Sequence, residues 1–159
     1  MKHRDILLYF LAALFLSSCS PEFDEFGQQQ GKLKTLNTSI SVTPEDVLLI
    51  DDEIVTHMDF TLEGNVLHAS VRGVIAPEKT RNVSVKTNME NQTLFISIDF
   101  RGVGDISCGL MDFYTITCDI TPIQKHCITI IIEVHSRQLQ MQADFTQQNS
   151  VFADFYHFY

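Results

Sequence analysis

The chain has 159 residues, of which 45% are hydrophobic, and this is enough for one folded domain with a buried core. Acidic residues outnumber basic ones by 20 to 11, which gives a formal net charge of −9 at pH 7. A surface with this charge repels phosphate backbones, so we expect no nucleic-acid partner.

The N-terminal segment has the three parts of a secretory signal. Lys2 and Arg4 precede an unbroken apolar run from Ile6 to Leu16, and small residues follow the run directly. The run is shorter than the roughly 18 to 20 residues that a membrane-spanning helix needs. We therefore expect residues 1–18 to be a signal peptide that is removed.

The signal ends in Leu16-Ser17-Ser18-Cys19, in which an aliphatic residue and two small residues precede a cysteine. This stretch resembles the lipobox of bacterial lipoproteins. The resemblance implies that Cys19 carries acyl chains such as palmitate and becomes the first residue of the mature protein. Two or three chains hold a protein at a membrane durably, whereas one chain does so only marginally. An ordinary signal peptide with a chance cysteine is the alternative.

Three acidic residues follow the predicted lipidation site, namely Glu22, Asp24 and Glu25. The cluster resembles the short acidic export signal of Bacteroidetes-type surface lipoproteins. The implied location is the cell envelope, with the protein lipid-anchored at the outer membrane or the cell surface. A solvated acidic tether explains the same residues equally well.

The segment from Gly27 to Thr38 contains few large apolar residues and is typical of a linker. We expect residues 19–38 to form the lipidated N-terminus and a flexible tether that lifts a folded domain off the membrane. Residues 39–159 are then the single folded domain.

Two hairpins are predicted in the first half of this domain. Apolar residues alternate with polar ones from Ile54 to Leu62 and again from Val66 to Val74, and Glu63-Gly64-Asn65 lies between the two runs. A second pair of alternating runs, 83–89 and 94–100, is separated by Glu90-Asn91-Gln92.

Three further strands are predicted in the second half, at 113–120, 128–134 and 139–145. A turn at Pro122 would join the first two as a hairpin that places Ile116 opposite Ile130. Ile131 is apolar on the opposite face from Ile130, which indicates a central strand covered on both faces.

With Ile40 to Ile50 and the aromatic C-terminal segment, the count is seven to nine short strands with turn signals about every ten residues. This pattern predicts an all-β fold, a single antiparallel β-sandwich of the Ig-like kind. The segment from Cys108 to Ile132, with Tyr114-Thr115-Ile116 before Pro122, resembles the C-terminal sandwich of NigD-like lipoproteins. That resemblance implies the fold and nothing more.

The chain ends in an aromatic segment that is the one candidate ligand surface. Its large aromatic residues are Phe152, Phe155, Tyr156, Phe158 and Tyr159. A final strand or an aromatic plug on the sandwich core is the simpler interpretation. A small outer-membrane barrel is a third, because such barrels end in alternating apolar residues with a terminal aromatic one.

Lipidation of Cys19 would leave Cys108, Cys118 and Cys127, an odd number, so that at most one disulfide forms among them. The predicted Pro122 hairpin turns Cys118 and Cys127 to opposite faces, which argues against a bond between these two. A buried thiol that packs as a small hydrophobe is expected for at least one of the three.

Residues with potential chemistry are sparse. His57 and Asp59 lie two apart on the polar face of a strand and could face one ligand, although a solvated face explains them too. Asp51-Asp52-Glu53 lacks the spaced ligands and the glycine of a calcium loop. No motif for a nucleophile, a phosphate loop, a zinc site or a dinucleotide occurs, so we expect neither metal nor cofactor nor enzymatic activity.

The sequence therefore predicts a membrane-anchored envelope lipoprotein with a non-catalytic binding or accessory domain. The membrane is a partner through the acyl chains on Cys19, and the sandwich would bind a protein or a glycan. The alternative is a structural or assembly subunit of an outer-membrane or surface complex.

Overall fold

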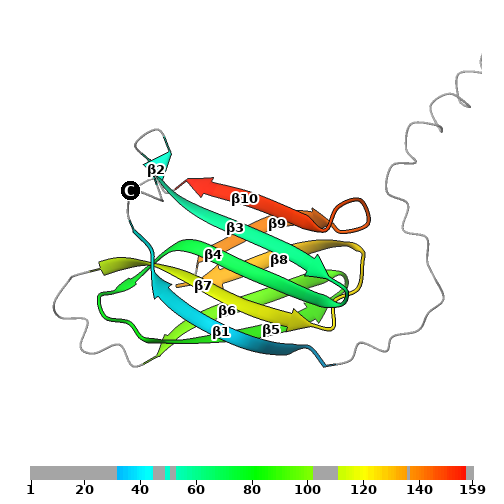
Figure 1. The fold of residues 1–159 in the computed structure, drawn as a ribbon, viewed down its shortest axis with the longest axis horizontal. Helices are drawn as coiled ribbons and strands as arrows, with labels where there is room; N and C mark the ends of the chain where they lie inside the picture. The colour runs from blue at the N-terminus through cyan, green and yellow to red at the C-terminus, as the bar shows by residue number, and fades with distance from the viewer. Residues whose placement is uncertain (1–31, 45–48, 51–52, 102–110, 136, 157–159) are drawn as a thin grey trace, which may run out of the picture.

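The computed structural model describes residues 32–44, 49–50, 53–101, 111–135 and 137–156. These residues form ten strands and two packed sheets (Figure 1). The strands are β1 (Lys34–Val42), β2 (Leu49–Ile50), β3 (Glu53–Glu63), β4 (Val66–Pro77), β5 (Asn82–Glu90), β6 (Thr93–Arg101), β7 (Met111–Thr121), β8 (Cys127–Val134), β9 (Arg137–Asp144) and β10 (Ser150–Tyr156).

The larger sheet has the order β1-β7-β4-β3-β10, with the two-residue β2 also paired to β3, and the smaller sheet has the order β5-β6-β8-β9. The predicted all-β sandwich is confirmed. All pairings are antiparallel except that of β6 with β8, which is parallel. The described residues contain no helix with the length and apolar character needed to cross a membrane.

The core lies between the two sheets because each long strand turns its apolar residues inward, at every second position. The largest fully buried side chains come from both sheets and from the connections between strands: Met58, Phe60, Leu62, Leu67, Leu94, Ile96, Tyr114, Ile116, Ile120, Ile123 and Phe145. The outward positions of the same strands are mostly polar, and they carry the candidate site.

Both predicted hairpins are confirmed. In the first, Glu63 pairs with Val66 across a two-residue turn, and Gly64 has a φ of 62° that favours glycine. In the second, Glu90 pairs with Thr93, and the residues between them, Asn91 and Gln92, both have positive φ. Two positive φ values are those of a type I′ turn, whose twist matches that of the strands.

The predicted hairpin at Pro122 is wrong. Strand β7 pairs with β1 and β4 in the larger sheet, whereas β8 pairs with β6 and β9 in the smaller one. Residues 122–126 therefore cross from one sheet to the other, and Ile116 does not face Ile130 across a ladder. A crossing of this length looks the same in the sequence as a hairpin loop, because both are a short segment with turn residues between two alternating runs.

Two further predictions are corrected at the level of single elements. Strand β1 begins at Lys34, inside the predicted tether, and pairs with β7 from its first residue. Strand β8 is interior in its sheet as expected, but its second face is not fully covered, because Ile131 is only partly buried while Ile130 is fully buried.

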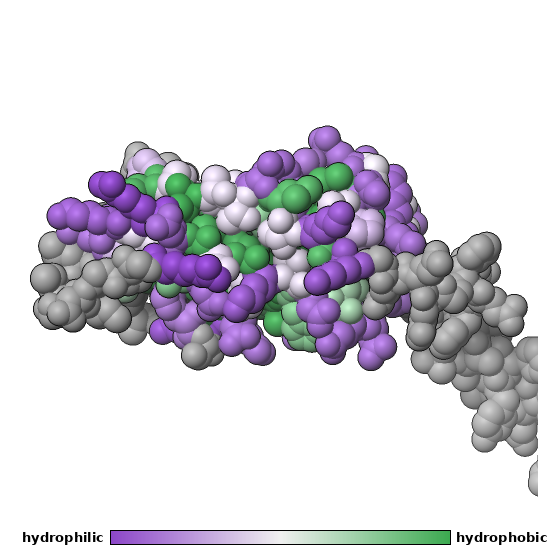
Figure 2. All heavy atoms as spheres, turned by 90° about the horizontal axis from the view of Figure 1, so that it is seen from below, coloured by the Kyte–Doolittle hydropathy of each residue, from purple (hydrophilic) through white to green (hydrophobic). Residues whose placement is uncertain are grey.

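The side of the sandwich formed by β1 and β5 is partly apolar. Figure 2 views this side and shows apolar surface in two areas among polar side chains. Leu33, Ile40, Val83, Val85 and Met89 pack against the core here without being fully buried. The two strands are joined across the sheets by a hydrogen bond of 2.9 Å between the hydroxyls of Thr35 and Thr87.

Candidate functional site

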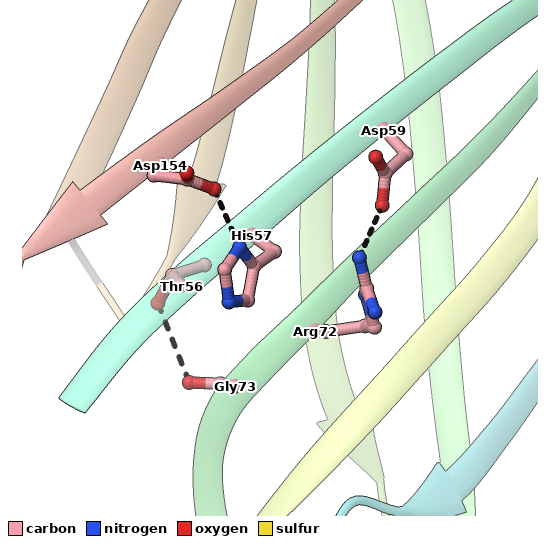
Figure 3. A network of polar contacts seen from close by, with 6 residues as sticks. All are labelled: Thr56, His57, Asp59, Arg72, Gly73 and Asp154. Carbon is pink, nitrogen blue, oxygen red and sulfur yellow. Dashed lines mark hydrogen bonds and ion pairs between the residues drawn. The ribbon is translucent and has the colours of Figure 1, made fainter. Parts of the chain in front are cut away.

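The outer face of the larger sheet carries ionisable side chains from three adjacent strands (Figure 3). His57 and Asp59 come from β3, Arg72 from β4 and Asp154 from β10. The register places His57 directly between Arg72 and Asp154, so the four groups form one cluster on the sheet surface. We call these four residues the polar cluster.

The polar cluster consists of two pairs. Nδ1 of His57 lies 2.5 Å from Oδ1 of Asp154, and Nη2 of Arg72 donates to Oδ2 of Asp59 over 2.9 Å. His57 and Asp59 therefore do not face one common ligand, as the sequence had allowed, because each already binds a partner on a neighbouring strand. Figure 3 shows the two pairs side by side across β3.

Arg72 is held from one side only. Its Nη2 binds Asp59, but its Nε is buried and has no hydrogen-bond partner. A buried donor without an acceptor costs free energy, since it has lost its water and gained nothing. Beneath this face, the Thr56 hydroxyl donates to the carbonyl oxygen of Gly73 over 3.4 Å, which adds a side-chain link between β3 and β4 (Figure 3).

A second group of polar contacts continues across the same face toward β1. Asp119 on β7 accepts from Asn37 Nδ2 over 2.6 Å and from His68 Nδ1 over 2.7 Å. The hydrogen bond from Asn37, and then that from His68, holds the pKa of the Asp119 carboxyl below its ordinary value of 3.8. Hydroxyl pairs between Ser39 and Thr117, and between Thr61 and Ser150, complete a face on which neighbouring strands are linked by side chains.

The predicted aromatic surface is assembled only in part. Phe152 and Tyr156 on β10 are 75% and 47% exposed, and they lie on either side of Asp154 in the sequence. Phe155 turns the other way and packs against the core. Phe158 and Tyr159 lie outside the described residues.

The part of the chain that the structure describes does not bring metal ligands together. No group of three or more His, Cys, Asp and Glu side chains is gathered there in a way that could hold a metal ion. Of the acidic run Asp51-Asp52-Glu53, the first two residues lie outside the described residues, and Glu53 begins β3.

The cysteines divide between the sheets. Cys118 on β7 is buried and free, and burial, followed by the charge of Asp119, raises the pKa of its thiol to about 11. Such a thiol is inert and packs as a small hydrophobe. Cys127 is exposed on β8 in the other sheet, so the two do not bond, although the hairpin argument that predicted this was wrong. Cys19 and Cys108 lie outside the described residues.

The sequence pattern placed His57 and Asp59 correctly on an outer face but missed the partners that give them a role. Arg72 follows the same alternation on β4 and could have been found as a second outward charge. Asp154 could not, because its contact with His57 depends on the pairing of β3 with the last strand, 97 residues later.

Comparisons with protein families, with curated proteins and with solved structures find no match to this chain.

Proposed function

We propose that the chain is a lipid-anchored protein of the cell envelope whose β-sandwich binds a ligand without catalysis. The observation that carries the binding role is the outer face of the larger sheet, where Phe152 and Tyr156 are exposed beside the polar cluster. Exposed aromatic rings next to oriented hydrogen-bonding groups are typical of recognition surfaces.

The anchor is supported by the sequence alone. Leu16-Ser17-Ser18-Cys19 ends an apolar run of the length and charge pattern of a signal, and the polar residues that follow would leave a spacer before β1. Acyl chains on Cys19 would then hold the sandwich near a membrane surface.

The shape of the site supports binding in preference to catalysis. The polar cluster lies on a sheet face in which Asp59, Arg72 and Asp154 are partly open to solvent. Acid–base and nucleophilic catalysis depend on groups that converge on a reacting atom in a site that excludes water. Here the ionisable side chains bind one another in pairs, which suits a surface that offers fixed donors and acceptors.

The anchor is tested by metabolic labelling with palmitate. We expect the wild-type protein to incorporate the label and to fractionate with membranes, and the Cys19→Ala variant to lose both properties. Equal labelling of the two proteins would contradict the lipid anchor.

The binding role is tested by solvent protection in the native envelope. Ser70 and Ser97 are matched half-buried positions on the outer faces of the larger and the smaller sheet. We expect a cysteine introduced as Ser70→Cys to react more slowly with a membrane-impermeant thiol reagent in intact envelopes than in the purified full-length protein. Site-resolved mass spectrometry separates its signal from that of the native Cys127.

The Ser97→Cys variant is the control for this measurement, and its reactivity should change little between envelope and purified protein. Equal protection at both positions would mean that the envelope shields the whole domain, and the outer face of the larger sheet would then not be the binding surface.

A structural or assembly subunit is the second candidate, and the apolar side formed by β1 and β5 favours it (Figure 2). Val42 is 61% exposed on β1, next to the partly buried apolar residues of this side. Stable complexes bury apolar surface of this kind. Chemical crosslinking in envelopes would then give a product of defined size that the Val42→Ser variant no longer forms.

A further inference from the structure

We infer that the ligand of this surface is an uncharged glycan chain that lies along β10 and stacks its sugar rings on Phe152 and Tyr156. This inference rests on the proposed binding role and gives it a ligand class. It is drawn from the spacing of the two rings, the charge balance between them and the polar neighbours of Phe152.

The spacing of the rings fits a chain ligand. Phe152 and Tyr156 are four residues apart on β10, and both side chains lie on the outer face of the sheet. At the usual rise of a β-strand, their Cα atoms are about 13 Å apart. One sugar ring cannot cover both aromatic rings at this distance, whereas two rings of one oligosaccharide can. The C–H-bearing face of a pyranose carries partial positive charge, which the negative face of an aromatic ring attracts.

The groups between the two rings fit hydroxyls. Asp154 lies between Phe152 and Tyr156 and is held by His57, while Asp59 is held by Arg72 in the next row of the sheet. These pairs present carboxylate oxygens, a ring nitrogen and guanidinium N–H groups in fixed orientations. Such groups recognise hydroxyls, which donate and accept hydrogen bonds at the same time.

The charges of the site argue against an ionic ligand. Two carboxylates, one guanidinium and one imidazole leave the polar cluster without an excess of positive charge, and the chain as a whole carries −9. A polyanion such as a uronic-acid polymer or a nucleic acid would meet repulsion. A cationic ligand would have to compete with Arg72 and His57 for the two carboxylates.

The neighbours of Phe152 argue against a protein ligand, although Tyr156 lies opposite the apolar Val55. The register places Phe152 opposite Asp59, and Asp59 opposite Ser70, so the row that runs inward from the ring is polar. A protein interface has a contiguous apolar core that is fully desolvated. Two aromatic rings separated by the hydrogen-bonded pair of His57 and Asp154 do not form such a core, but they match a ligand that is itself alternately apolar and hydroxylated.

The position at the sheet edge leaves room for a long ligand. Strand β10 ends the order of the larger sheet, and Figure 1 shows it on the outside of the sandwich, above β9 of the other sheet. A chain can therefore follow β10 along its length, and its ends can extend beyond the domain.

The test uses full-length protein in detergent micelles and affinity electrophoresis through gels that contain soluble polysaccharides. Neutral polymers with β-linked glucose, xylose or mannose units are compared with polygalacturonate as the anionic polymer. We expect retardation of the wild type by at least one neutral polymer and none by polygalacturonate. Phe152→Ala and Tyr156→Ala should each weaken the affinity by a few-fold to about tenfold.

Phe95→Ala is the matched control, because Phe95 is an exposed aromatic residue, 37% accessible, on the outer face of the smaller sheet. Its retardation should equal that of the wild type. Thermal unfolding of all three variants checks the fold, and since the three rings are exposed we expect little change in their midpoints.

Three results would overturn the inference. The first is the absence of retardation in every neutral polymer, and the second is equal retardation of the Phe152→Ala, Tyr156→Ala and wild-type proteins. The third is retardation by polygalacturonate alone. In each case slower reaction of Ser70→Cys in envelopes would still support a binding surface, so failure of the glycan and failure of the proposed function can be told apart.

Discussion

Asp119 joins three strands through one carboxylate. It lies on β7 between β1 and β4, and its two oxygens accept hydrogen bonds from Asn37 and His68. Both hydrogen bonds favour the charged form, which is why the pKa of this carboxyl lies below 3.8. A group whose pKa is lowered in the folded state adds stability above its unfolded pKa. That contribution is lost as the pH falls below about 3.8 and through the folded pKa.

The Asn37→Gly variant tests the larger of these two causes. Asn37 has a φ of 50°, which glycine also adopts, so the substitution removes the side chain and keeps the backbone. We expect the pKa of Asp119 to rise toward 3.8, measured by NMR titration of the carboxyl carbon. Asp144 is an internal control, because its lowered pKa depends first on Thr146 and should not change. An unchanged Asp119 titration would show that Asn37 does not hold the carboxylate.

At this scale the sequence predicts which way a side chain faces and little else. Alternation put His57, Asp59, Cys118 and Ile130 on the correct faces, because the period of a strand is local. The partner of each polar residue is set by register between strands distant in the chain. The identity of a single residue does not indicate that register, so the contacts within the polar cluster could not be predicted from the sequence.

Strand β8 has one face in the core and one face in partial contact with solvent. Ile130 is fully buried between the sheets, whereas its neighbour Ile131 is partly buried beside Phe95 on the outer face. The two side chains are chemically identical, adjacent and in the same strand. They therefore separate the effect of core packing from that of β propensity.

We expect Ile130→Ala to lower the free energy of unfolding by about 2–5 kcal/mol, because it leaves a cavity in the core. Ile131→Ala should cost about 1 kcal/mol or less, since the surrounding side chains and water can fill the space. Urea denaturation of the two variants and the wild type gives both values. Equal losses would mean that the outer face of β8 is covered in the folded protein.

The elements that could be predicted are those closed by local turns. The hairpins of β3 with β4 and β5 with β6 have two-residue turns between alternating runs, and the sequence predicts both. The parallel pairing of β6 with β8 was not found, because the chain leaves the sheet, forms β7 in the other sheet and returns. Parallel neighbours always need such a crossover, and its path is decided by the packing of the whole sandwich.

The passage of the chain between the two sheets is fixed by a buried tyrosine. Strand β4 ends at Pro77 in the larger sheet, and β5 begins at Asn82 in the smaller one. Between them the hydroxyl of Tyr114, on β7, accepts from the Thr80 backbone N–H and donates to the Pro77 carbonyl, both over 3.1 Å. The ring itself is fully buried. Thr80 also donates to the Pro77 carbonyl from its own N–H over 3.2 Å and from its hydroxyl over 2.6 Å, so Tyr114 and Thr80 hold this connection together.

We expect Tyr114→Phe to lower the free energy of unfolding by about 1–3 kcal/mol, because buried polar groups lose a partner while the ring is kept. Unfolding should stay a single transition in far-UV and near-UV circular dichroism, since both sheets share one core. Tyr156→Phe is the control, because that hydroxyl belongs to an exposed residue, and its effect should lie within about 0.5 kcal/mol. A comparable loss in both variants would contradict a special role of the Tyr114 hydroxyl.

The place of β1 at the edge of the larger sheet sets the order in which the chain can fold. Among the described strands its ladder partner is β7, and Lys34 pairs with Thr121, so the first strand has to wait for a segment almost ninety residues later. Contacts of such sequence separation are slow to form. A nascent chain thus keeps its first strand unpaired until most of the domain has been synthesised. For the exported protein proposed above, this delay would leave the first strand unpaired while the chain passes through a membrane channel.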